Sequence, residues 1–167
     1  ASSYLEVIHN SVTGRPPELD LDFEKSIQSF LRRAINNGLV ASAHDVSDGG
    51  IAVAISESCI ASGLGVECNF LVEKIRTDRL LFAEGGSRIL VSINSKKLAS
   101  WDLLLNELNG ISSQALPAIK IGTVRTDGRL LITQNGNSLI DIPVSQLADT
   151  FENSIPMRIA RDPLSCS

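Results

Sequence analysis

The strongest constraint on the fold is an apolar segment of helix length, which runs from Ile51 to about Ser62 and stops at Gly63. Apolar residues occupy nearly its whole circumference, so the segment predicts a helix that is buried on several sides. A short apolar run at 39–43 precedes it and predicts a buried strand. A buried strand followed by such a helix favours a fold in which helices pack on a sheet.

Other elements follow from the periodicity of apolar residues. Helical spacing over 22–37 predicts an amphipathic helix, with Asp20 or Asp22 suited to cap its start and Gly38 to end it. Further helices are predicted over 4–8, 77–82, 95–108 (capped by Ser95) and 144–151, and strands over 64–70, 88–93, 118–124, 130–133 and 138–142. The last three strands are expected to pair in order as a meander, around turns such as Asn135-Gly136. This order predicts an α/β (α+β) domain with one mixed sheet.

The chain is expected to divide into three segments. These are an N-terminal linker arm at 1–20, an α/β domain at 21–156 and a loose tail at 157–167. Because Ala1 is not an initiator methionine and the arm resembles a connection, we expect a segment of a longer protein. A processed terminus and an expression remnant are the alternatives.

Composition excludes several classes of partner. The net charge is −4 with a pI near 5.1, and no basic run exists, which excludes a nucleic-acid partner. No stretch approaches the roughly 20 apolar residues of a membrane span. The cysteines at 59, 68 and 166 are odd in number and widely spaced, which favours a reducing cytoplasm over a disulfide framework. No cluster of Cys and His predicts a zinc site.

A polar loop at 44–50 carries the chemistry that the sequence offers. It connects a predicted strand to a predicted helix, which is where open α/β sheets gather ligands. The start of the helix supplies N–H groups suited to a phosphate, and a glycine pair allows close approach to the backbone. Asp45 and Asp48 carry oxygen ligands suited to Mg²⁺, and Ser47 carries a hydroxyl that can donate to a phosphate.

The same loop has a purely structural interpretation. Ser47 or Asp48 can cap the following helix. Gly49 and Gly50 can serve only to turn the chain, and His44 can be a core histidine with its hydrogen bonds satisfied. The spacing matches neither a P-loop nor a dinucleotide fingerprint, so both interpretations stay open.

A second glycine pair lies between Glu84 and Arg88, just before a predicted strand. The two charged side chains are expected to form an ion pair that fixes this turn, the alternative being that they face a ligand or a subunit interface. No nucleophile with an activating base is found, so no catalytic residue is predicted.

Residues 42–54, Ser-Ala-His-Asp-Val-Ser-Asp-Gly-Gly-Ile-Ala-Val-Ala, strongly resemble a segment of the phosphoribosylformylglycinamidine synthase family. Supporting matches extend the resemblance over about 4–156; they lie at 4–17, 81–92, 121–124 and 140–144. Ala83 departs from the family pattern, in which a glycine is expected. The chain resembles the C-terminal domain of the second half of that enzyme.

The resemblance implies the fold and activity of that family. The fold is a three-layer α/β/α domain with a mixed sheet, of the kind found in the C-terminal domain of aminoimidazole ribonucleotide synthetase. The enzyme is an ATP-dependent carbon–nitrogen ligase of purine biosynthesis, which converts formylglycinamide ribonucleotide and glutamine-derived ammonia into the formylglycinamidine. The isolated domain is expected to be inactive, because the catalytic residues lie mostly in other domains.

The resemblance also implies a ligand site and partners. Asp45 would bind Mg²⁺ and Ser47 would contact ATP, with the loop completed by His44, Asp48, Gly49 and Gly50. The partners would be the other domains of the synthase, a glutaminase subunit and a small accessory subunit. We also expect self-association through an exposed sheet or helix.

Two alternatives remain beside this assignment. The domain can be a non-catalytic scaffold, in which the loop only caps a helix and the domain packs against its twin. It can also belong to another member of the same superfamily. The Arg15-Pro16-Pro17 arm and the run at 140–144 favour the synthase over the latter.

Overall fold

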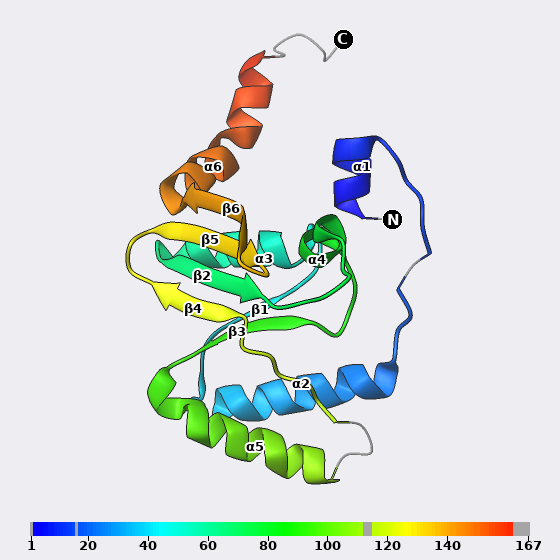
Figure 1. Cartoon of the computed structure of the whole chain (residues 1–167), viewed down its shortest axis with the longest axis vertical. Helices are drawn as coiled ribbons and strands as arrows, with labels where there is room; N and C mark the ends of the chain where they lie inside the picture. Colours follow the sequence, from blue (N-terminus) through cyan, green and yellow to red (C-terminus); the bar gives the residue numbers. More distant parts are fainter. Residues whose placement is uncertain (1, 16, 112–114, 162–167) are drawn as a thin grey trace. The chain divides into compact units, whose positions relative to one another are not determined.

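A computed structural model describes residues 2–15, 17–111 and 115–161 (Figure 1). The helices are α1 (Ser3–His9), α2 (Leu21–Asn36), α3 (Gly50–Ser62), α4 (Thr77–Phe82), α5 (Leu98–Ile111) and α6 (Val144–Arg161), with a 3-10 turn η1 (Ser95–Lys97). The strands are β1 (Val40–Asp45), β2 (Gly65–Phe70), β3 (Ile89–Ile93), β4 (Gly122–Arg125), β5 (Arg129–Gln134) and β6 (Asn137–Pro143). The chain forms two compact units: the first unit comprises 1–54 and 75–120, and the second unit comprises 55–74 and 121–167.

The first unit is built around α2 and α5, which lie side by side (Figure 1). Asp20 caps α2 by accepting a hydrogen bond from the Phe23 amide, as predicted, at 2.9 Å. The buried cluster between the helices consists of Phe30, Ala34, Leu39, Trp101, Leu104 and Leu116. The rings of Phe30 and Trp101 meet edge to face with centroids 4.7 Å apart, a favourable arrangement for aromatic pairs.

A two-stranded antiparallel ribbon of β1 and β3 completes the first unit. Val40, Val91 and Ile93 pack against the buried cluster. Ser42 and Ser92 are paired across the two strands, and their exposed hydroxyls form a hydrogen bond of 2.6 Å. The prediction of a buried strand at 39–43 was wrong for most of its length, because Leu39 is buried but the strand β1 that follows it is mostly exposed.

The second unit contains a mixed sheet in the order β4-β2-β5-β6, with β2 and β5 parallel and the other pairs antiparallel. Leu130, Ile132 and Cys68 point to its buried face. Burial raises the pKa of the Cys68 thiol to about 12, and the nearby thiol of Cys59 on α3 contributes. The second half of α3 therefore covers this face, as predicted for an all-round apolar helix.

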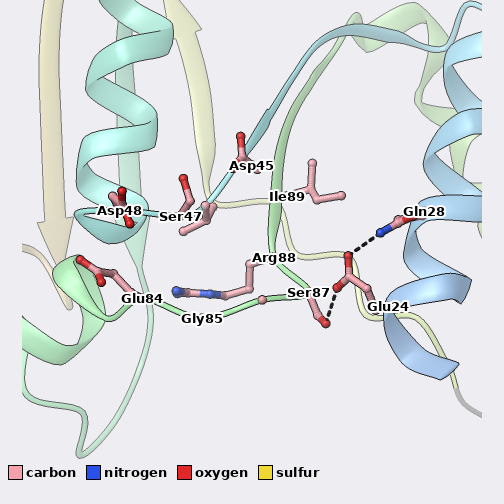
Figure 2. A pocket seen from close by; sticks show the side chains of 12 residues that line it. Glu24, Gln28, Asp45, Ser47, Asp48, Glu84, Gly85, Ser87, Arg88 and Ile89 are labelled. Atoms are coloured by element: carbon pink, nitrogen blue, oxygen red, sulfur yellow. Dashed lines mark hydrogen bonds between the residues drawn. The ribbon is translucent and has the colours of Figure 1, made fainter. Parts of the chain in front are cut away.

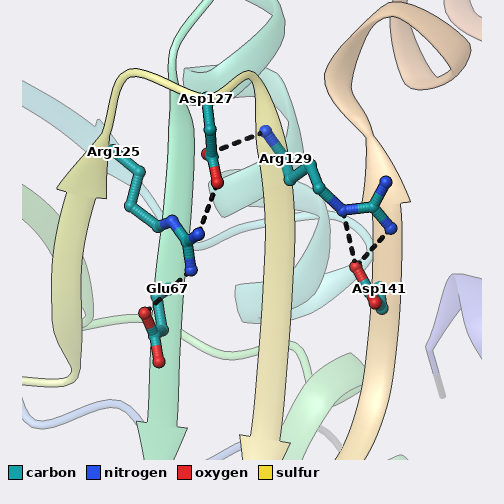
Figure 3. A network of polar contacts seen from close by, with 5 residues as sticks. All are labelled: Glu67, Arg125, Asp127, Arg129 and Asp141. Carbon is teal, nitrogen blue, oxygen red and sulfur yellow. Dashed lines mark hydrogen bonds and ion pairs between the residues drawn. The ribbon is translucent and has the colours of Figure 1, made fainter.

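The other face of this sheet carries cross-strand ion pairs (Figure 3). Arg125 on β4 pairs with Glu67 on β2 at 2.9 Å and also with Asp127. Arg129 on β5 pairs with Asp141 on β6 at 2.6 Å. These exposed pairs match opposite charges across neighbouring strands and keep this face polar.

The mixed α/β class is confirmed, but three details differ from the predictions. The strands form two sheets rather than one. The predicted hairpin of 118–124 with 130–133 is wrong, because β2 lies between β4 and β5. Asn94, not Ser95, caps the turn before α5. Apolar alternation identifies a strand but not its partner, and β2 arrives from a distant part of the sequence.

The final helix is longer than predicted. α6 runs from Val144 to Arg161, past the expected end at Phe151, and contains Pro156. The predicted tail therefore begins helical, and the division at residues 20 and 156 stays a prediction. Among the described residues, no helix is both long and apolar enough to cross a membrane.

Candidate functional site

The loop that follows β1 is held by main-chain hydrogen bonds. The amide of Val46 donates to the carbonyl of Arg88 at 3.0 Å, and the amide of Gly50 donates to the carbonyl of Ser47 at 3.1 Å. The Val46 side chain is 3% exposed and anchors the loop in the first unit. The loop at 45–50 therefore lies against the segment that connects α4 to β3.

Gly50 is required by the packing at the start of α3. Its φ is +72°, in the left-handed region that favours glycine. A Cβ atom there would lie 2.7 Å from the carbonyl oxygen of Leu81 and 2.8 Å from that of Ala83. Gly49 has a φ of +75°, and its Cβ would lie 2.4 Å from a methyl of Val53. The glycine pair thus has a structural role whether or not a ligand approaches.

Glu84 holds the loop from the other side. Its Oε1 atom accepts hydrogen bonds from the amide of Gly49 at 2.9 Å and from the amide of Ser3 at 2.7 Å. Burial alone would raise the pKa of Glu84, but these bonds outweigh it, and the pKa lies below its ordinary value. Arg88 donates instead to the carbonyl of Ala83. The predicted ion pair is therefore wrong, since both side chains bind main-chain groups.

Glu24 is a residue that the sequence interpretation missed. It accepts a hydrogen bond of 2.6 Å from the Ser87 hydroxyl and one of 2.8 Å from Gln28. The bond from Ser87 is the largest of the causes that lower the pKa of Glu24. Ser87 has a φ of +62°, so Glu24 fixes a residue in an unfavourable backbone region. The i, i+4 spacing of Glu24 and Gln28 was the only signal in the sequence, and it points to a helix surface.

These segments border an open hollow of about 500 Å³ (Figure 2). Its lining consists of Glu24, Gln28, Asp45, Val46, Ser47, Asp48, Glu84, Gly85, Gly86, Ser87, Arg88 and Ile89. Figure 2 shows the β1–α3 loop on one side, the segment after α4 on another, and α2 on the third.

The hollow contains three of the six predicted site residues. Asp45, Ser47 and Asp48 line it, and the Asp45 side chain is 76% exposed. Gly49 and Gly50 lie beside it as backbone supports. His44 is on β1, where its Nδ1 atom hydrogen-bonds the carbonyl of Asp45 at 2.6 Å. The Mg²⁺ and nucleotide roles of these six residues stay predictions.

The geometry limits what the hollow can bind. Glu24 and Glu84 already accept hydrogen bonds from the chain, which leaves Asp45 and Asp48 as the carboxylates exposed at the rim. Within the described ranges, no group of three or more His, Cys, Asp or Glu side chains is arranged to hold a metal. Mg²⁺ in phosphate sites commonly takes one or two carboxylates, with phosphate and water completing the shell. Asp45 fits such a partial site.

The expected phosphate cradle at the start of α3 is partly occupied. The amide of Gly49 donates to Glu84, and that of Gly50 donates to the carbonyl of Ser47. Any phosphate at this loop would therefore meet the Ser47 hydroxyl or other amides. Sequence alone did not reveal this, because Glu84 lies 35 positions away.

Comparison with known proteins identifies close relatives of the chain. Residues 1–133 match the family model "AIR synthase related protein, C-terminal domain". The phosphoribosylformylglycinamidine synthase subunit PurL of Prochlorococcus marinus (strain MIT 9303) is 52% identical over 161 residues, which is 96% of this chain and 20% of that protein. PurL of Nostoc sp. (strain PCC 7120) is 43% identical over 163 residues, again 20% of its length. The chain thus spans about a fifth of these relatives.

Solved structures share the fold. The structure described as T. maritima PurL complexed with ATP has a TM-score of 0.66 and 20% identity, covering 83% of this chain and 24% of that one. PurLQS from Thermotoga maritima gives the same TM-score and identity over 78% of this chain and 22% of that one. At this identity the likeness establishes the arrangement of helices and strands alone.

Proposed function

Since the chain belongs to the AIR synthase related protein C-terminal domain family, we propose that it serves as one domain of a phosphoribosylformylglycinamidine synthase. The observation that carries this proposal is the 52% identity to a PurL subunit over 96% of the chain. The loop at 44–50, which carried the resemblance, borders the hollow of the first unit. A domain spanning a fifth of its relatives would act only with the rest of the enzyme.

The proposed reaction is the conversion of formylglycinamide ribonucleotide into the formylglycinamidine. ATP would phosphorylate the amide oxygen, and ammonia would then displace phosphate at that carbon. Mg²⁺ would neutralise phosphate charge and orient the nucleotide. A structural relative described as complexed with ATP supports the choice of nucleotide.

Within this reaction the chain would form one wall of a nucleotide site. Asp45 would offer a carboxylate oxygen to Mg²⁺, because its side chain is exposed at the end of a fixed strand. Ser47 would donate its hydroxyl to a phosphate, with Asp48 beside it at the rim. His44, Gly49 and Gly50 would hold the loop in shape. The remaining ligands would come from other domains, since this hollow lacks a complete metal shell.

The proposed partners are the other domains of the synthase, a glutaminase subunit and a small accessory subunit. A structural relative described as PurLQS supports an assembly of several subunits. Two buried free thiols, Cys59 and Cys68, support a reducing, cytoplasmic location.

Nucleotide titration of the full-length gene product tests the ligand role of Asp45. Asp45→Asn is expected to weaken Mg²⁺-dependent ATP binding about tenfold or more, as expected when a charged ligand is lost. Asp141→Asn, which changes a carboxylate in the second unit, serves as the control and should bind normally. Unchanged ATP affinity in Asp45→Asn would remove the assigned ligand role.

A second candidate function is that of a structural scaffold. It is favoured by the finding that Glu84 and the Ser47 carbonyl already accept the amides of Gly49 and Gly50. In that case Asp45→Asn changes neither nucleotide affinity nor turnover, whereas Gly50→Ala disrupts assembly of the full-length enzyme. Asp45→Asn therefore separates the two functions, because Gly50→Ala disturbs the loop under either of them.

A further inference from the structure

The contacts of Glu84 join two segments that are far apart in the sequence. One carboxylate oxygen accepts the amide of Ser3, the first residue of α1, at 2.7 Å. The same oxygen accepts the amide of Gly49, in the loop that carries Asp45 and Ser47, at 2.9 Å. Because a single atom binds both donors, a change at either donor alters the acceptor available to the other.

α1 depends on few contacts for its position. It has seven residues, and none of them is buried. The ring of Tyr4, in α1, stacks parallel on the ring of Phe82 in α4, with the ring centroids 4.7 Å apart. Ser3 also binds Glu84, through both its amide and its side chain. A helix held in this way can dock or detach at modest cost, because a short helix has little stability of its own.

The loop at 45–50, by contrast, is packed directly on the end of α4. The α-carbon of Gly50 lies so close to the carbonyls of Leu81 and Ala83 that no side chain fits between them. Glu84 follows this end of α4 immediately. The docking point of α1 and the support of the loop are therefore the same short segment.

We propose that Glu84 is a positioning residue that couples the docking of α1 to the conformation of the loop at 45–50. When α1 is docked, the Ser3 amide helps to fix the carboxylate, which in turn holds the Gly49 amide. When α1 detaches, the carboxylate loses one donor and the loop loses a fixed acceptor. This coupling rests on the contacts of the chain and does not depend on the proposed function.

The lowered pKa of Glu84 agrees with the donors on this carboxylate, which are the amides of Gly49 and Ser3 and the side chain of Ser3. Other charged groups border the hollow beside it: Asp45 and Asp48 on the loop, Arg88 on the following segment and Glu24 on α2. Burial opposes ionisation of Glu84, and its low pKa is maintained by the amides of Gly49 and Ser3, by the Ser3 side chain and by the positive charge of the N-terminus.

Ser3→Pro tests the coupling because it removes the Ser3 amide donor, together with the hydroxyl, at a position that accepts proline. Ser3 is the first residue of α1, where proline is tolerated, and Ser2 has the extended backbone that proline requires before it. Ser3→Ala is the matched control, since it removes the hydroxyl, which also bonds Glu84, but keeps the amide. The readout is the ¹H–¹⁵N spectrum of the 167-residue chain, recorded from neutral to acidic pH.

In the unchanged chain the amide signals of Ser3 and Gly49 are expected to shift together, with one midpoint below 4.5, the ordinary value for a glutamate. Ser3→Pro should raise the midpoint seen at Gly49 and speed hydrogen exchange of that amide on the order of tenfold, the effect of losing a charge-assisted hydrogen bond. Ser3→Ala should change both less. Glu84→Gln should abolish the shared titration.

The proposal is overturned if Ser3→Pro leaves the midpoint and the exchange rate of Gly49 unchanged while α1 has lost its bond to Glu84. It is also overturned if Ser3 and Gly49 titrate with different midpoints in the unchanged chain. Should Ser3→Pro disturb folding, Tyr4→Ala offers a second route, because it removes the stacking on Phe82 and leaves both donors intact. It too should speed exchange at Gly49. None of these measurements involves nucleotide, so they stand apart from the proposed function.

Discussion

Replacing Gly50 with alanine is expected to destabilise the first unit more than the same change at Gly38. Both glycines lie in the left-handed region, with φ of +72° and +63°. A non-glycine residue there costs about 1–2 kcal/mol. The new methyl at Gly50 would also lie 2.7 and 2.8 Å from carbonyl oxygens of α4 and the residue after it, which are backbone atoms that cannot turn aside.

Forcing extra volume into such a contact costs a further 1–3 kcal/mol or so. The total loss for Gly50→Ala is thus about 2–5 kcal/mol. At Gly38 the nearest atom to the new methyl is the far end of the flexible Lys97 side chain, at 3.9 Å. Gly38→Ala should therefore show only the backbone cost, about 1–2 kcal/mol.

Urea unfolding followed by tryptophan fluorescence measures both variants. Trp101, the one tryptophan of the chain, lies in the buried cluster of the same unit as both glycines. A less stable folded state should appear as a lower urea midpoint with an unchanged slope. Equal midpoints for the two variants would refute the claim that the start of α3 packs on the end of α4.

Three further results are expected. Because the pKa of Glu24 is lowered in the fold, its stabilising effect is full above its ordinary value of 4.5 and is lost as the pH falls through the lowered value. Glu24→Gln should therefore flatten the decline in urea midpoint as the pH falls below 4.5, and an unchanged decline would contradict this. Phe30→Ala should lower the free energy of unfolding, measured by thermal unfolding, by about 3–5 kcal/mol, because Phe30 lies in the buried cluster. A loss below about 1 kcal/mol would contradict this. In a chain that carries Cys166→Ser, Cys59 and Cys68 should resist a thiol reagent at pH 8 until urea unfolds the chain, because burial raises the pKa of both thiols. Rapid labelling of the folded chain would contradict their burial.

Local signals in the sequence predicted most helices and several strands. α3 begins and ends at glycines with positive φ, where the apolar segment and Gly63 indicated. The turn at Asn135-Gly136 joins β5 to β6, because both residues adopt the positive φ that such a hairpin turn needs. These features depend on neighbours in the chain, which a single sequence displays.

Long-range pairing could not be predicted in the same way. β2 enters between β4 and β5, although no pattern within β2 distinguishes that neighbour from another. The run at 39–43 has the composition of a buried strand, but β1, which contains most of it, is mostly exposed. Apolar alternation specifies which face of a strand is buried, whereas the partner is decided by the packing of the whole unit.

The candidate site was predictable only in part, for the same reason. Asp45, Ser47 and Asp48 were identified from the loop and do line the hollow. Glu24 and Glu84 reach the site from segments far away in the sequence, and each fixes a residue in the left-handed region, Ser87 and Gly49. Only the folded chain reveals that these carboxylates are already engaged with it.

The most direct test of the proposed function is a turnover measurement on the full-length gene product that contains this chain. The protein is supplied with ATP, Mg²⁺, ammonium and formylglycinamide ribonucleotide, and ADP release is measured beside formation of the amidine. The account predicts that both products form in equal amounts and only when the ribonucleotide is present. ATP hydrolysis that is indifferent to the ribonucleotide, or no turnover by a folded protein assembled with its accessory subunit, would contradict it.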